Sequence, residues 1–326
     1  MFSYIIRKSL YAIPILIGVN VITFLLFFVV NPPDIMARRM LGEKNVTPEA
    51  IQKWKSDNGY NLPSFVNTKE AGWAVVTNTI FFQKSMRLFW FDFGRSDRTK
   101  VDIGSEIKQR MGPSFLLALP TFIFGIMVEI VMAMLIAYYR GSYLDFWTVL
   151  ICVIMMSVSM LFYIIGAQYF FGKVLKLFPI SGYDTGIYSL KFIMLPVIIG
   201  IIGGVGVGIR FYRTLFLEEV SKDYVRTARA KGLSERSVLF RHVLKNAMIP
   251  ILTDVMMTLP FLFVGSLLME SFFAIPGLGS FTIDAINAQD FAIVRSMVFL
   301  GAVLYIIGQL LTDISYTIAD PRIRLS

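Results

Sequence analysis

Long apolar runs alternate with short polar stretches along most of this 326-residue chain. A helix needs about 20 apolar residues to cross the roughly 30 Å hydrocarbon core of a bilayer, and six runs approach or exceed that length. The six runs are residues 11–30, 115–139, 146–171, 192–209, 249–269 and 296–311. The pattern therefore predicts an all-α integral membrane protein with six transmembrane helices.

The polar segments between these runs divide the chain into three expected parts. Residues 1–30 form an N-terminal segment with the first transmembrane helix, 31–112 form an extracytoplasmic insertion, and 113–326 form a core with helices two to six. The first run is longer than the apolar region of a signal peptide, and Asn-Pro-Pro-Asp follows it where a cleavage site needs small residues. We therefore expect a retained first helix with its N-terminus in the cytosol.

Composition and charge narrow the possible partners and ligands. Hydrophobic residues make up 56% of the chain and charged residues 16%, whereas a soluble domain has about 25% charged residues. The net charge of +9 fits the excess of Lys and Arg in cytosolic loops of membrane proteins, so no nucleic-acid partner is expected. Cys152 is the single cysteine and His242 the single histidine, which excludes a disulfide or a Cys- or His-cluster metal site within this chain.

The polar stretch 218–250 lies between the fourth and fifth runs and is rich in Lys and Arg. It predicts two short helices. Apolar positions four residues apart share one face of the first helix; they are Val220, Tyr224 and Ala228. Gly232 is the expected end of that helix, because glycine accepts the left-handed backbone of a C-cap. Ser234 is the expected N-cap of a second helix through Ala247, and Pro250 the expected start of the next element.

This stretch resembles the cytoplasmic coupling loop of bacterial ABC importer permeases, in the form found in the oligopeptide, dipeptide and nickel group. The resemblance is carried by DYVRTARAKG at 223–232 and RHVLKNAMIP at 241–250. The general pattern of such loops is Glu-Ala-Ala, three residues, then Gly. Here Arg226, Thr227 and Ala228 stand in place of Glu-Ala-Ala, which is typical of the peptide group, and Asp223 is the nearest candidate for the role of the missing Glu.

The resemblance implies that the cytosolic loop 213–248 contains a coupling helix that docks on a separate ATPase. The implied coupling residues are Asp223, Tyr224, Arg226, Thr227, Ala228, Arg229, Lys231 and Gly232. Basic side chains there would give charge complementarity, which sets register and partner choice. From charge alone, the alternative is a solvated basic loop held in the cytosol by the positive-inside rule.

The insertion 31–112 contains an expected short helix at 47–58, with Pro48 at its first position. A dense aromatic stretch follows, made of Trp73, Phe81, Phe82, Phe89, Trp90, Phe91 and Phe93. It suits either a small domain core with an interfacial belt or a docking surface for a substrate-delivering protein. Residues 92–96 resemble the family segment before the second span, whereas 63–90 match it poorly.

Four residues are candidates for the translocation path: Glu129, Pro276, Gly277 and Gly279. Glu129 interrupts the second apolar run, and an ionisable group at that depth faces protein or a water-filled path. It can therefore line the path, near the amino group of a peptide, or make an interhelical hydrogen bond. The segment Pro276–Gly279 resembles the family's re-entrant or scoop-like element at the outer mouth. Asp254 is interpreted as an interfacial or helix-N-terminal charge.

The fourth run carries five glycines, which permit close helix packing or a bend. They are Gly200, Gly203, Gly204, Gly206 and Gly208. The chain ends in Ala-Asp-Pro-Arg-Ile-Arg at 319–324, which matches the cytosolic tail of the family.

Taken together, the resemblance implies a permease subunit of an ATP-driven importer, most simply for di- or oligopeptides. Nickel, metal-chelate or opine import is an alternative within the family. An ion-coupled secondary transporter using Glu129 or Asp254, and a membrane scaffold, are alternatives from other classes.

The sequence carries no ATP-binding or hydrolase motif, so we expect no enzyme activity. No cofactor is expected on this chain, and ATP with Mg²⁺ would bind partner subunits. The implied partners are a second permease in a heterodimer, two ATPases and an extracytoplasmic substrate-binding protein. The expected location is the bacterial inner membrane, with many spans and both termini in the cytosol.

Overall fold

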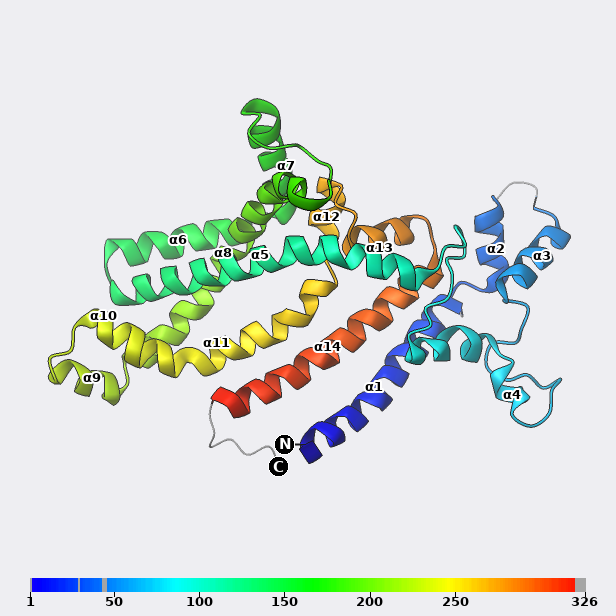
Figure 1. The fold of residues 1–326 in the computed structure, drawn as a ribbon, viewed down its shortest axis with the longest axis horizontal. Coiled ribbons are helices and arrows are strands. Elements are labelled where there is room, and N and C mark those ends of the chain that lie inside the picture. The colour runs from blue at the N-terminus through cyan, green and yellow to red at the C-terminus, as the bar shows by residue number, and fades with distance from the viewer. Residues whose placement is uncertain (1, 29, 43–45, 320–326) are drawn as a thin grey trace. The chain divides into compact units, whose positions relative to one another are not determined.

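The computed structural model of the chain describes residues 2–28, 30–42 and 46–319, and these residues are mainly helical (Figure 1). The α-helices are α1 Phe2–Phe28, α2 Pro33–Leu41, α3 Pro48–Asn58, α4 Ala74–Thr77, α5 Ile103–Tyr138, α6 Tyr143–Ser157, α7 Met160–Ala167, α8 Ser189–Val220, α9 Asp223–Ala230, α10 Glu235–Ser237, α11 Leu244–Thr258, α12 Leu267–Phe273, α13 Leu278–Asn287 and α14 Phe291–Ala319. Among the described residues, sheet-type pairing is limited to an isolated bridge between Arg95 and Asp102.

Short π and 3-10 segments extend or join several of these helices. The π segments are η1 Phe81–Ser85, η3 Gln168–Val174 and η5 Val238–Val243. The 3-10 segments are η2 Met86–Trp90, η4 Gly186–Tyr188 and η6 Leu259–Phe263. Residues 320–324 of the expected cytosolic tail lie outside the described residues.

Among the described residues, five helical segments are long and apolar enough to cross a membrane, and a sixth span exists if one bent pair is counted. The spans are Ile6–Phe28, Ile103–Tyr138, Gly186–Val220, Glu235–Phe263 and Phe291–Ser315. The prediction of an all-α integral membrane protein is confirmed.

The third predicted span is not one continuous helix, which corrects the sequence interpretation. Tyr143–Ser157 and Met160–Val174 meet at an angle of 89°. Val158 and Ser159 at the break have extended backbone, so carbonyl groups at the end of α6 lose their helical partners. The Met155 carbonyl oxygen accepts from the Val158 amide at 3.3 Å and also from the Tyr163 hydroxyl at 2.9 Å.

The chain consists of two compact units. The first contains residues 1–110 and 281–306, and the second contains 111–280 and 307–326. In the first unit, a core of Phe24, Phe28, Met36, Tyr60 and Ile80 joins α1 to the insertion. Helix α3 begins as predicted, because the Thr47 side chain caps it by accepting from the Ala50 amide.

In the second unit, α6 and α8 pack along each other, and small residues allow their close approach (Figure 1). A Cβ atom on Gly206 would lie 2.9 Å from the Cys152 carbonyl oxygen. The Arg213 guanidinium also holds Asp145 at the start of α6 with two hydrogen bonds of 2.8 and 2.9 Å. The predicted close packing of the glycine-rich run is confirmed at Gly206.

Replacing Gly206 with Ala should destabilise the second unit by about 1–3 kcal/mol, because the added methyl group meets backbone that cannot move independently. The measurement is thermal unfolding of the detergent-purified protein. Gly166→Ala in α7 is the matched control, since a Cβ there meets nothing within 4 Å. Equal melting temperatures for the two variants would contradict the packing argument.

Candidate functional site

The predicted coupling segment forms α9 and α10 at one end of α8 and α11 (Figure 1). The first short helix begins at Asp223 and not earlier, because Val220 is the last residue of α8. Lys222 has an extended backbone that separates the two helices. This corrects the expectation that Val220 shares a helix with Tyr224 and Ala228.

One face of α9 is anchored in the apolar core of the second unit. Val225 is fully buried and Ala228 nearly so, and both belong to a cluster with Val238 and Val243 of η5. Tyr212 and Phe216 of α8 belong to the same cluster. Because core packing is close and resists deformation, α9 is a rigid projection joined to two spans.

The opposite face of α9 is polar and exposed. It presents Asp223, Arg226, Thr227, Lys231 and Gly232 to solvent. Asp223 stands in the first turn of α9, where the partial positive charge of a helix N-terminus favours an acidic side chain. Exposed ion pairs such as Arg226–Asp223 contribute little stability, so these charges remain available to a partner.

Two of the predicted coupling residues, Tyr224 and Arg229, lie at the edges of this face and are held by hydrogen bonds. Arg229 donates to both carboxylate oxygens of Glu235 at 2.9 and 3.2 Å, which joins α9 to α10. The Tyr224 hydroxyl donates to Glu219 at 2.6 Å. Burial, with the hydrogen bond to Glu219, raises the pKa of the Tyr224 phenol to about 12, so the hydroxyl remains a donor at neutral pH.

The turn after α9 follows the prediction at Gly232 and Ser234. Gly232 has a φ of +75°, the left-handed backbone that favours glycine, and Ser234 caps α10 by accepting from the Ser237 amide. Pro250 does not start a new element, which corrects the prediction. It lies inside α11, and Glu235–Phe263 is one span-length helical segment.

A hollow of about 480 Å³ adjoins the exposed face of α9. Its lining residues are Tyr224, Thr227, Ala228, Lys231, Leu233, Ser237, Arg241 and His242. The combination of an apolar floor and cationic rim is suited to a protein segment that carries acidic side chains.

Glu129 lines a second cavity, of about 240 Å³, in the membrane-spanning part of the second unit. Its walls come from α5, α8 and α11, and Asp254 lines it as well. The Tyr212 hydroxyl donates to Asp254 at 2.6 Å. Glu129 lies directly against Gly208, so the glycine-rich run makes room for this carboxyl group.

Asp254 lies ten residues after the first residue of α11, so it is not a helix-N-terminal charge. The sequence interpretation is wrong on that point, because the helix begins well before Pro250. The structure instead brings Asp254 and Glu129 to one cavity.

The segment Pro276–Gly279 is organised around Glu270, which the sequence analysis did not identify. Glu270 has 0% exposure and accepts hydrogen bonds from the Ser114 hydroxyl at 2.8 Å, the Ser266 amide at 3.1 Å and the Ser280 amide at 3.0 Å. Ser114 also accepts from the Leu278 amide at 2.7 Å. The carboxylate therefore links α5, the start of α12 and the turn into α13.

Glycine is required at two of the predicted path positions for a packing reason. A Cβ on Gly277 would overlap Glu270, and a Cβ on Gly279 would lie 2.6 Å from the backbone of Ser266. The only sequence signal for this hub was an acidic residue beside serines and glycines in a segment that otherwise lacks charge.

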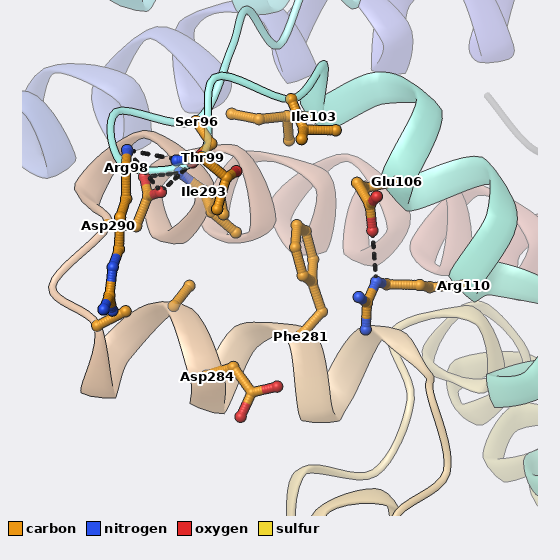
Figure 2. A pocket seen from close by; sticks show the side chains of 13 residues that line it. Ser96, Arg98, Thr99, Ile103, Glu106, Arg110, Phe281, Asp284, Asp290 and Ile293 are labelled. Carbon is orange, nitrogen blue, oxygen red and sulfur yellow. Dashed lines mark hydrogen bonds and ion pairs between the residues drawn. The ribbon is translucent and has the colours of Figure 1, made fainter. Parts of the chain in front are cut away.

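Figure 2 shows a further cavity, in the first unit, with a volume of about 490 Å³. Its apolar lining includes Ile103, Phe281 and Ile293. Arg110 lies over the Phe281 ring, with 4.8 Å from the guanidinium carbon to the ring centroid, and pairs with Glu106 at 2.8 Å. Apolar walls with charges of both signs suit a ligand with an amphiphilic chain.

One wall of this cavity is held by Asp290, which is buried (Figure 2). Asp290 accepts from the Ser96 hydroxyl and from the amides of Asp97 and Arg98, at 3.3 and 3.4 Å for the amides. Asp97 in turn accepts from the Tyr60 hydroxyl at 2.7 Å. Burial raises the pKa of the Asp97 carboxyl group, and the Tyr60 hydrogen bond and the Lys84 charge oppose that rise.

The cavity was not predicted from the sequence, although Ser96 belongs to the 92–96 segment that carried part of the resemblance. Within the described ranges, no three Asp, Glu, His or Cys residues come together in a way that could hold a metal ion.

Replacing Glu270 with Ala should destabilise the protein by about 3 kcal/mol or more, because one buried hydroxyl and two buried amides lose their acceptor. Thermal unfolding in detergent measures the change. Glu270→Gln is the control, since it keeps one acceptor oxygen and should lose less. An alanine variant as stable as wild type would contradict the assignment of Glu270 as a structural hub.

Comparison with known families gives two matches that together span nearly the whole chain. Residues 129–325 match the family described as binding-protein-dependent transport system inner membrane component. Residues 1–118 match the N-terminal part of the membrane component of binding-protein-dependent transport systems.

Individual relatives match over full length. A protein of Brucella abortus strain 2308 named as a peptide transport system permease is 33% identical over 99% of both chains. An oligopeptide transport system permease of Bacillus subtilis is 28% identical over 99% of both chains. A dipeptide transport system permease of Escherichia coli K12 is 28% identical, also over 99% of both chains. The resemblance noted in the coupling segment is thus confirmed, and the chain belongs to the family of binding-protein-dependent transport system inner membrane components, with the type I ABC permease fold.

Proposed function

We propose that this chain is one of two permease subunits of an ATP-driven importer for di- or oligopeptides. The observation that carries the proposal is the full-length match to relatives named as peptide, dipeptide and oligopeptide permeases. The family consists of transport permeases and not of enzymes, so ATP is hydrolysed on separate subunits. ATP and Mg²⁺ bind those subunits in this proposal.

The coupling role rests on the geometry of α9. The partner ATPase contacts the exposed face with Asp223, Arg226, Thr227, Lys231 and Gly232. When ATP draws the two ATPases together, α9 moves with them as a rigid body. The packing of Val225 and Ala228 on η5 passes that movement to α8 and to the span containing α11. Surface charge sets the register of docking.

Topology follows from where the basic coupling segment must lie. If α9 meets a cytosolic ATPase, both chain termini are cytosolic and the insertion 31–112 is extracytoplasmic, as a six-span count requires. An inner-membrane location agrees with the description of the family. A second homologous permease, two ATPases and an extracytoplasmic binding protein complete the importer.

A second candidate function has one observation in its favour. Glu129 and Asp254 share a cavity in the membrane-spanning part, which is an arrangement that ion-coupled secondary transporters use. Such a transporter has no need of a docking projection, so α9 favours the ATP-driven importer. Nickel, metal-chelate or opine solutes remain alternative substrates within the family, since the binding protein selects the solute.

Replacing Gly232 with Leu should leave the protein in the membrane but reduce ATPase co-purification at least several-fold. The turn needs a left-handed backbone, which costs a side-chain-bearing residue about 1 kcal/mol, and the leucine adds bulk to the docking face. The measurement is mass spectrometry of proteins recovered with the tagged chain from native membranes in mild detergent.

Gly186→Leu is the matched control. Gly186 has a φ of +69°, and neither glycine has an atom within 4 Å of a built Cβ, so the two variants differ only in location. Reproducible recovery of the wild-type chain without ATPase or permease partners would contradict the importer proposal. Normal ATPase recovery with Gly232→Leu would contradict only the docking face.

Replacing Glu129 with Gln should lower peptide uptake several-fold while ATPase recovery stays normal, because the variant replaces an ionisable carboxyl group in the path with a neutral amide of nearly the same volume. Uptake of labelled peptide by whole cells measures the effect. Unchanged uptake at normal expression would contradict a role in the path and leave Glu129 as an interhelical contact.

A further inference from the structure

The two terminal spans of the first unit provide a scale of membrane depth. A helix rises 1.5 Å per residue. The span Ile6–Phe28 has its midpoint at Ile17, and the span Phe291–Ser315 has its midpoint at Val303. The C-terminal end of α1 meets the N-terminal end of α14, where the Phe27 and Phe291 ring centroids are 5.3 Å apart.

Part of the insertion contacts α1 away from that end, closer to the middle of the span. The Asn20 side-chain amide donates to the Ser85 carbonyl oxygen at 2.7 Å. Asn20 lies three residues from the span midpoint, or about 4.5 Å along the axis, whereas the hydrocarbon core extends about 15 Å from its centre. The ring of Phe24, seven residues from the midpoint, makes edge-to-face contacts with the rings of Phe65 and Phe81, with centroids 4.9 and 5.1 Å away.

Contacts between the insertion and α14 independently place the insertion at a similar depth. The Phe89 and Phe299 ring centroids are 5.4 Å apart. Phe299 lies four residues from the midpoint of its span, or about 6 Å along the axis. The π segment η1 and the 3-10 segment η2 therefore lie at a depth where a bilayer has hydrocarbon.

The inward face of this segment is built for that depth. Thr79, Ile80, Ser85 and Leu88 are buried against the rest of the unit. Backbone that is not α-helical is tolerated in hydrocarbon only where protein satisfies its polar groups. Asn20 supplies such a partner at the junction of η1 and η2, which explains an amide side chain within an apolar span.

The outward face is aromatic. Trp90 is 71% exposed and Phe91 is 59% exposed, and the neighbouring span α1 also exposes apolar side chains, Leu25 and Leu26 among them. The charged residues of the segment have partners. The Lys84 ammonium group lies over the Tyr60 ring, 5.0 Å from its centroid. Arg87 forms an ion pair with Asp92 at 3.7 Å.

We propose that residues 79–93 form a re-entrant segment embedded in one leaflet of the bilayer, with Trp90 and Phe91 packed against lipid acyl chains. Under the topology of the proposed function, on which the choice of leaflet rests, this is the outer leaflet. The aromatic stretch of the insertion is then in part a lipid contact and not a docking surface for a soluble protein.

The test is site-directed spin labelling of the assembled transporter in lipid nanodiscs. Single cysteines replace Trp90 or Phe91, and every other cysteine, Cys152 included, is substituted. Power saturation compares collisions of the nitroxide with oxygen, which concentrates in hydrocarbon, and with a water-soluble nickel chelate. Both positions are exposed, so the substitutions leave the packed face intact.

Two further variants calibrate the measurement. Leu26→Cys on α1 reports lipid, and Asp57→Cys on the exposed side of α3 reports water. We expect labels at 90 and 91 to follow Leu26, with oxygen collisions several-fold above those at Asp57 and little contact with nickel.

Three results would count against these assignments. Strong nickel contact at 90 and 91 would place the segment in water, and low contact with both reagents would mean that another protein chain covers it; either outcome overturns the proposal. Nickel contact at Leu26 as well would instead show that α1 is not a span, which contradicts the proposed topology.

Discussion

Hydrocarbon offers no hydrogen-bonding partner to the backbone, and several departures from regular helix in the described residues meet this constraint with a polar side chain. At the break between α6 and α7, the Tyr163 hydroxyl donates to the Met155 carbonyl oxygen, which also accepts from the Val158 amide. At the junction of η1 and η2, Asn20 does the same from α1. Before α13, Glu270 accepts from two backbone amides. In these three places, a polar side chain supplies a hydrogen-bond partner to irregular backbone.

The cost of an unpaired polar group in hydrocarbon also explains why polar residues inside the spans have hydrogen-bond partners. Asp254 receives the Tyr212 hydroxyl, and Asp145 is held by Arg213 through two hydrogen bonds. Glu129 differs from these residues, because it lies against Gly208 and lines a cavity. A carboxyl group with free space around it is the kind of feature that transport, and not packing alone, would require.

In the proposed function, coupling depends on how firmly α9 is held in the second unit. Its buried residues are small or β-branched, so the helix lies close to η5, while its charges point to solvent where they cost little. A docking projection needs both properties, because a flexible loop would absorb the movement of a partner instead of passing it to the spans.

Local signals predicted local structure well. Thr47 caps α3, Gly232 adopts the left-handed turn, and Ser234 caps α10, because each depends on residues within one helical turn. Hydropathy predicted five of the spans as single helices, since crossing a bilayer requires length and apolarity alone, whereas the third predicted span is a bent pair of helices. Pro250 was misread because an internal proline is tolerated when neighbouring helices compensate for the lost hydrogen bond.

The sequence by itself therefore determined the class of the protein, most of its spans and the position of the short polar helix α9. Only the tertiary structure decided that the third span is broken, that Glu129 and Asp254 share one cavity, and that Glu270 and Asp290 organise the turns near them. Ser114 lies 156 residues from Glu270, and Ser96 lies 194 residues from Asp290. Pairings over such separations depend on how the helices pack, and no periodic pattern in one chain records that packing.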